Sequence, residues 1–237
     1  MFRANIEGKT LTVELEGLKG LNFVMRDHQT GSLWQQATGL AFEGPLKGKR
    51  LEMVDFLLTT WGEWKKLHPD TLAVRPDPNY LDRYRGTAPI RPQPAQPQPE
   101  RDRGTKLTND TRLRDREQVV GIEIPNGQKA YPIALLRQQT VVNDKVGSTA
   151  VLLVVTNGDT INAFSSTARG RTLTFQTKPG GADLTDKETG STWTPYGECT
   201  SGQLKGTKLA RLTPLPSFWF SWAEFFPETE VFAAAAN

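Results

Sequence analysis

The chain has 237 residues, of which 37% are hydrophobic and 9% aromatic, and its formal net charge at pH 7 is +3. This length fits one or two domains with a packed core, and no apolar run reaches the roughly 18 residues that a membrane-spanning helix needs. The single cysteine, Cys199, excludes an intramolecular disulfide and a cysteine-rich metal site.

The basic excess of the chain is confined to one stretch. Between Arg75 and Arg116, ten lysines and arginines accompany six aspartates and glutamates, so the rest of the chain is close to neutral. Recognition of nucleic acid needs a clustered basic patch with helical or aromatic readers. We therefore expect no nucleic-acid partner. The first residues, Met1 to Asn5, also lack the apolar segment of an export signal.

The first 74 residues are predicted to form short strands followed by one helix. Alternating apolar residues bounded by glycine predict strands at 10–15 and 21–26. Asp27 opens a tight turn, because aspartate accepts backbone N–H bonds and Gly31 can adopt positive φ. A second turn, at 44–48, leads to a predicted strand at 50–54.

A helix is predicted after Thr59 and Thr60, either of which can serve as its N-cap, and it ends before Pro69. Its apolar side chains recur every three residues, at Trp61, Trp64 and Leu67.

Residues 87–112 are predicted to be an extended linker, since prolines there alternate with glutamine, arginine and alanine. A second set of elements follows from residue 113 to 232, and the tail 233–237 is expected to fray. In this second set the patterns predict strands at 119–124, 128–131, 150–155 and 160–164, turns at 125–127 and 157–159, and a helix at 133–139.

One motif occurs twice. The pattern Asp-x-x-Thr-Gly-Ser-x-Trp spans residues 27–34 and returns at 186–193, and Gly-x-Leu-Lys-Gly at 44–48 returns at 202–206. Trp61 and Glu63 are matched by Trp222 and Glu224. A fixed order at a nearly constant offset predicts an internal duplication. The expected fold is therefore mainly β, a β-rich α+β protein with short helices, in two related units at 1–86 and 113–232, the first incomplete at its N-terminus.

The polar residues of the repeated turn are the main candidates for a binding site. Each also has a structural interpretation: the aspartates can hold an Asx-type turn, and the tryptophans can fill a core. No residue is assigned to catalysis or to a metal. The candidate binding residues are Asp27, Thr30, Ser32, Trp34, Asn143, Asp144, Asp186, Thr189, Ser191 and Trp193.

The remaining reactive side chains do not form a catalytic pattern. His28 and His68 are the only histidines, and a solvated or helix-capping role is favoured for both. Two histidines without suitable cysteines cannot build a closed zinc site. Cys199 is expected to be a small buried residue and not a nucleophile. No cofactor is predicted.

With these motifs in place, the chain resembles the bacterial and archaeal family called domain of unknown function 3179. The matching stretches are residues 25–36, 44–48, 60–71, 120–123, 130–132, 142–144 and 186–193. The resemblance implies an extracytoplasmic location.

The chain departs from that family at two motifs. Members usually carry His-Glu just before Val-Asn-Asp, and Cys-Pro-x-Cys after the next strand. In this chain the His-Glu positions hold Gln139 and Thr140. The two cysteine positions hold Val155 and Gly158. Close thiolates and a histidine are what redox chemistry or metal binding needs, so the second unit is expected to be a degenerate copy.

Three functional hypotheses follow. The first is a non-catalytic module that binds an unknown ligand or protein partner, or has a structural role. The second is a thiol-redox or metal-dependent enzyme whose active residues lie upstream of Met1. The third makes the two repeated turns paired carbohydrate sites, in which Trp34 and Trp193 stack on sugars.

Overall fold

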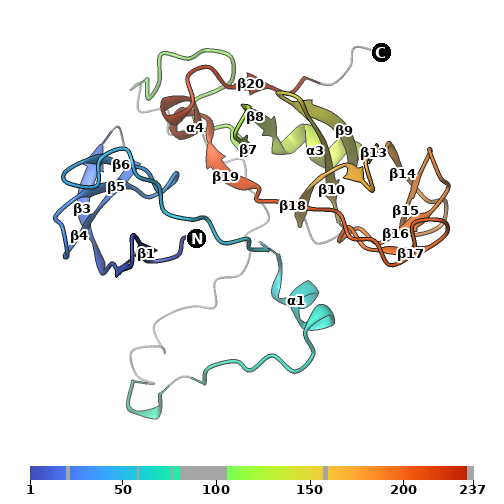
Figure 1. The fold of residues 1–237 in the computed structure, drawn as a ribbon, viewed down its shortest axis with the longest axis horizontal. Helices are drawn as coiled ribbons and strands as arrows, with labels where there is room; N and C mark the ends of the chain where they lie inside the picture. Colours follow the sequence, from blue (N-terminus) through green and yellow to red (C-terminus); the bar gives the residue numbers. More distant parts are fainter. Residues whose placement is uncertain (20–21, 58, 76, 81–105, 157–159, 234–237) are drawn as a thin grey trace.

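The computed structural model describes residues 1–19, 22–57, 59–75, 77–80, 106–156 and 160–233. The described chain is rich in β-structure, with several small sheets and three short α-helices (Figure 1). This confirms the predicted β-rich class. The predicted turn at 157–159 and most of the predicted linker lie outside the described residues.

The first part of the chain forms two small antiparallel sheets. Strand β1 (Asn5–Ile6) pairs with β2 (Lys9–Thr10). A four-stranded sheet follows, in the order β3 (Val13–Lys19), β4 (Asn22–Asp27), β5 (Leu33–Gln35) and β6 (Ala41–Glu43). Its core contains Leu11, Trp34, Ala41, Leu46 and Leu51.

Helix α1 (Trp61–Leu67) begins and ends where the sequence predicts. The Thr60 hydroxyl accepts a hydrogen bond from Glu63 N at 3.3 Å, and the His68 N–H donates to the Trp64 carbonyl at 2.8 Å. A short 3₁₀ helix, η1 (Pro78–Tyr80), lies beyond it. The capping contacts satisfy backbone groups that a helix end otherwise leaves unpaired.

The second half is built around two facing sheets. One has the order β19 (Leu215–Phe218), β7 (Gln118–Ile124), β8 (Gly127–Pro132) and β20 (Glu230–Val231). The other has the order β18 (Arg211–Leu212), β11 (Ile161–Ser165), β10 (Thr149–Val155) and β9 (Val141–Val146). A core that includes Ile122, Tyr131, Leu136 and Leu153 draws residues from both sheets and from α3 (Ile133–Gln139).

Two further layers cover the outer faces. Helix α4 (Trp219–Phe225) packs on the first of these sheets, in a core with Val119 and Ala130. Beside the second sheet lies a small sheet in the order β14 (Phe175–Thr177), β15 (Leu184–Asp186), β16 (Thr192–Trp193) and β17 (Cys199–Ser201). The pair β12 (Thr167–Ala168) and β13 (Arg171–Thr172) precedes it.

Two predicted strands differ from the structure. The one at 10–15 is interrupted, because the Leu11 N–H donates to the Ala4 carbonyl and β3 begins only at Val13. The one at 50–54 consists of isolated bridges at Arg50 and Met53. Its backbone bonds first with the 39–41 loop and then with residues 1–3, so no single ladder forms.

Candidate functional site

The first repeated turn is organised by the carboxylate of Asp27. This side chain has no exposed surface and accepts the Trp34 indole N–H at Oδ2 over 2.8 Å. Thr30 donates twice, from its backbone N–H to Oδ1 at 2.6 Å and from its hydroxyl to Oδ2 at 2.8 Å. Gly31 allows the chain to reverse, with φ of +71°.

The second repeated turn has the same arrangement. Asp186 has no exposed surface, and its Oδ2 accepts the Trp193 indole N–H at 2.8 Å. The Thr189 N–H donates to Oδ1 at 2.6 Å, and the Thr189 hydroxyl lies 2.8 and 2.9 Å from the two carboxylate oxygens. The two motifs therefore share their hydrogen bonds as well as their sequence.

The serines of both turns connect them to a neighbouring loop. Ser32 Oγ accepts the Leu46 N–H at 3.1 Å, and Ser191 Oγ accepts the Leu204 N–H at 3.2 Å. A Cβ on Gly44 would lie 2.7 Å from Ser32 Cα, so the loop can approach this closely only with glycine. Both serine hydroxyls are thus engaged inside the protein.

Burial decides what the turn residues can present to a ligand. Trp34 and Trp193 have no exposed surface, so neither indole offers a face for stacking in this structure. Burial alone would raise the pKa of the Asp27 carboxyl, but hydrogen bonds from Trp34 and Thr30 outweigh it and hold that pKa below its ordinary value. The carboxylate is consequently a charged group whose acceptor positions are filled from within.

Asn143 joins two sheets. Its Nδ2 donates to the Phe175 carbonyl at 2.8 Å, and its Oδ1 accepts the Phe175 N–H at 2.7 Å. The amide therefore completes the backbone bonding of β14 at the edge of β9.

The neighbouring Asp144 belongs to a polar cluster between β8 and β9. It accepts the Tyr131 hydroxyl at 3.0 Å and lies 2.8 Å from Lys129 Nζ, which is also 3.4 Å from Glu230. Burial, and then the Asp144 charge, raise the pKa of Tyr131. Asn143 thus adjoins the second repeated turn through Phe175, the register partner of Asp186. The printed contacts of Asp144 are instead with Tyr131 and Lys129, outside both turns.

The family-motif positions described by the structure lie together. The Val155 N–H donates to the Thr140 carbonyl at 2.8 Å, and Thr140 has an unusual φ of +50°. Gly158 lies outside the described residues. Cys199 is buried, its thiol donates to the Ser201 carbonyl at 3.3 Å, and burial raises the pKa of this thiol.

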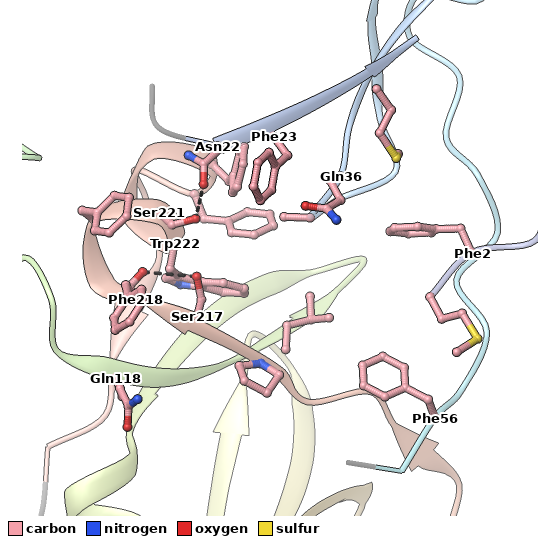
Figure 2. Close-up of a pocket in the computed structure, with 18 of the residues that line it drawn as sticks. Phe2, Asn22, Phe23, Gln36, Phe56, Gln118, Ser217, Phe218, Ser221 and Trp222 are labelled. Carbon is pink, nitrogen blue, oxygen red and sulfur yellow. Dashed lines mark hydrogen bonds between the residues drawn. The ribbon is translucent and has the colours of Figure 1, made fainter. Parts of the chain in front are cut away.

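A large apolar cleft lies between the sheet β3–β6 on one side and α4 and β19 on the other (Figure 2). Its volume is about 860 Å³, within the usual range for ligand pockets. Aromatic and other apolar side chains dominate its wall, and none of the described residues that line it has a charged side chain. Phe2, Phe23 and Phe56 contribute from the first half, whereas Phe218, Phe220, Trp222, Phe225 and Phe226 contribute from the second.

Among the described lining residues, five polar side chains interrupt this apolar wall. Asn22 and Ser221 bond each other, and Asn22 Nδ2 donates to Glu224 Oε2 at 2.8 Å, which ties the hairpin β3–β4 to α4. Ser217 donates to the Phe218 carbonyl at 3.2 Å. The side-chain amides of Gln36 and Gln118 are the other two polar groups of the cleft.

Sequence reasoning missed this cleft. One signal was available: residues 218–226 contain six aromatic residues in nine positions, more than one buried helix face can hold. The surplus rings line the cleft.

Within the described ranges there is no group of three or more histidine, cysteine, aspartate or glutamate side chains that could hold a metal ion. None of the described helices is long and apolar enough to cross a membrane. A family model described as a protein of unknown function (DUF3179) matches residues 1–229. No curated protein and no solved structure matches the chain.

Proposed function

This chain belongs to the family of proteins of unknown function (DUF3179), and we propose that it is a non-catalytic binding module whose ligand occupies the apolar cleft. The single observation that carries this proposal is the cleft itself, which is large and lined by aromatic rings from both halves of the chain, with no charged side chain among its described lining residues. The class of ligand follows from that lining. An uncharged, largely apolar molecule, such as an acyl chain, would exchange water for aromatic and methionine side chains.

The geometry of the repeated turns supports this choice of site. Asp27 and Asp186 have no exposed surface, and each accepts hydrogen bonds from a tryptophan and a threonine of its own turn. A ligand or metal at either carboxylate would have to displace bonds that hold the turn. We therefore assign both turns to the scaffold and not to carbohydrate binding.

The shared hydrogen bonds of these turns also support the proposal that the chain contains two related units. Matching contacts extend beyond the motif: Thr12 N donates to Gln29 at 2.8 Å, as Thr174 N does to Glu188 at 2.8 Å. The proposed bounds remain 1–86 and 113–232.

The positions of the missing family motifs favour a non-catalytic role. Thr140 and Val155 are directly hydrogen-bonded, so a His-Glu pair and the first cysteine of Cys-Pro-x-Cys would adjoin each other there. The side chains of this chain at those positions are an amide, a hydroxyl and an alkyl group, none of which ionises near neutral pH. We propose that this second unit has lost the chemistry that the resemblance implies.

Binding to the cleft can be measured with the uncharged dye Nile red. We expect saturable binding with one dye per chain. Dodecanol should compete more strongly than dodecanoate, because the described side chains of the wall carry no charge that could pair with a carboxylate. Phe23→Ser should weaken binding about tenfold, on the order of 1.4 kcal/mol for the loss of one phenyl contact. Phe23 is 50% exposed, so its replacement should leave the fold intact.

Leu15→Ser is the matched control. Leu15 is 63% exposed on the same hairpin but does not line the cleft. Its replacement should leave dye affinity unchanged. Unsaturable binding, or equal losses from Leu15→Ser and Phe23→Ser, would contradict the proposal.

A further inference from the structure

The packing of α4 shows which surface buries the two tryptophans of this short helix. Trp219 and Trp222 are 0% and 2% exposed because α4 lies on the hairpin β7–β8. The Trp222 ring sits directly against Gly121 of β7, where an added Cβ would lie 2.0 Å from Cζ3. The chain then continues into β20, which adds to β8 as a parallel strand, with Val231 opposite Ala130.

Helix α1 and the residues after it have the same local geometry. The Trp64 indole N–H donates to Thr71 Oγ1 at 2.9 Å, and the Trp222 indole N–H donates to Thr229 Oγ1 at 2.9 Å. The backbone turns agree as well: Thr71 N donates to the His68 carbonyl at 3.1 Å, and Thr229 N donates to the Phe226 carbonyl at 3.0 Å. These bonds also correct the sequence alignment, since they match Trp64, and not Trp61, with Trp222.

We call residues 61–74 the α1 corner. In contrast to α4 and β20, this corner has most of its apolar side chains in solvent, although Trp64 is half-buried. Trp61 is 54% exposed where Trp219 is fully buried, and Leu72 and Val74 are 94% and 99% exposed. In Figure 1, α1 stands apart from the sheets, whereas α4 lies beside β7 and β19.

The contacts that hold the corner use other side chains. Tyr196 donates its hydroxyl to Glu63 at 3.4 Å, and the hydroxyls of Thr59 and Thr160 are 2.7 Å apart. The described residues therefore tether the corner through polar groups and leave Trp61, Leu72 and Val74 uncovered. A preformed corner with exposed apolar side chains is a surface suited to a partner.

We propose that the α1 corner docks on an uncovered antiparallel β-hairpin carried by another polypeptide. The hairpin would be of the β7–β8 type, with a glycine beneath Trp64 and a free edge to which residues 72–74 add as a parallel strand. Both features of the partner, the glycine and the free strand edge, are inferred from the packing of α4 and β20 on β7–β8. A second copy of this chain is not the donor, because its own α4 already occupies that hairpin.

This surface is separate from the apolar cleft. None of Trp61, Trp64, Leu72 and Val74 lines the cleft, so docking of a hairpin and binding of an apolar ligand can succeed or fail independently.

The test supplies the proposed partner to the full chain. A second copy of residues 113–132 is joined to the C-terminus through a flexible Gly/Ser linker, which raises its effective concentration. Hydrogen exchange read by mass spectrometry then follows residues 61–74. In the second half of the chain, the Phe232 N–H donates to the Ala130 carbonyl at 2.8 Å. Val74 occupies the position that matches Phe232, so its N–H should bond to the added hairpin. We expect exchange at Val74 to slow at least tenfold.

Two variants of the added hairpin make the result specific. A Gly121→Val change in the added copy should abolish the slowing, because the side chain would occupy the place of the Trp64 ring. An Ile122→Thr change in the added copy should preserve it, because Ile122 faces away from α4, into the core between the two sheets.

Three outcomes would overturn the proposal. The first is unchanged exchange at Val74 with the added hairpin. The second is equal slowing with the Gly121→Val hairpin. The third is strong protection of residues 61–74 in the unaltered chain, which would mean that the chain already covers its own α1 corner.

Discussion

Replacing Asp27 with asparagine tests the central claim about the repeated turn. Two donors, the Trp34 indole N–H and the Thr30 hydroxyl, converge on Asp27 Oδ2, while the Thr30 N–H reaches Oδ1. An asparagine side chain keeps one acceptor oxygen and replaces the other with an NH₂ group. In either amide orientation, at least one donor of the turn then faces another donor.

The expected loss of stability is large for an isosteric change. An unsatisfied buried donor costs about 1–3 kcal/mol, and hydrogen bonds to a charged acceptor are worth more than those to a neutral one. We therefore expect Asp27→Asn to lower the free energy of unfolding by about 2–4 kcal/mol. That is a substantial part of the roughly 5–15 kcal/mol that stabilises an ordinary domain.

Urea denaturation at pH 7, followed by tryptophan fluorescence, measures this loss. Asp186→Asn should cost a similar amount, because Asp186 has the same partners in its own turn. Asp70→Asn is the control, since Asp70 is exposed and its replacement should change the midpoint little. An Asp27→Asn protein as stable as the original would refute the reasoning.

The pH dependence gives an independent check. Because the folded-state pKa of Asp27 is lowered, its stabilising contribution is complete above the unfolded-state pKa of about 4 and declines as the pH falls through the folded-state value. The stability difference between the original protein and Asp27→Asn should therefore be constant near neutral pH and shrink in acid. A difference that grows in acid has the wrong sign for this mechanism.

Two further predictions concern close packing at glycine. Gly121→Ala places a Cβ 2.0 Å from the Trp222 ring and should cost about 1–3 kcal/mol or more, seen as a lower Tm; an unchanged Tm would show that the ring can move aside. Gly197 and Gly206 have similar positive φ values, +83° and +81°, so alanine at either position has a similar backbone cost. A Cβ at Gly197 would lie 2.6 Å from the Phe164 ring, whereas a Cβ at Gly206 would have no neighbour within 4 Å. Gly197→Ala should therefore cost about 1–3 kcal/mol more than Gly206→Ala in urea denaturation, and equal losses would contradict the packing argument.

The sequence by itself determined the features that depend on neighbouring residues. The turn at Asp27 could be predicted because its donors and acceptors lie within seven positions of one another. Helix α1 could be bounded because Thr60 caps it and Pro69 follows it. The hairpin β7–β8 was equally readable, since Pro125 and Asn126 form a turn between two strands and Gly127 follows directly.

The sequence was a poor guide where backbone partners come from distant segments. The predicted strand at 50–54 has strand-like residues, but its hydrogen bonds are shared between two other parts of the chain, so no continuous ladder forms. The polar residues of each turn are hydrogen-bonded to one another, but their burial could not be read from their order in the sequence.

Only the tertiary structure decided which apolar side chains are buried and which are exposed. Trp61 and Trp219 each begin a seven-residue helix with the same corner after it, but only Trp219 has a hairpin beneath it. The cleft is likewise lined by Phe23 and Phe225, which are about two hundred positions apart in the sequence. Hydrogen bonds within a turn are fixed by neighbouring residues, whereas burial depends on which distant segment supplies the opposing surface.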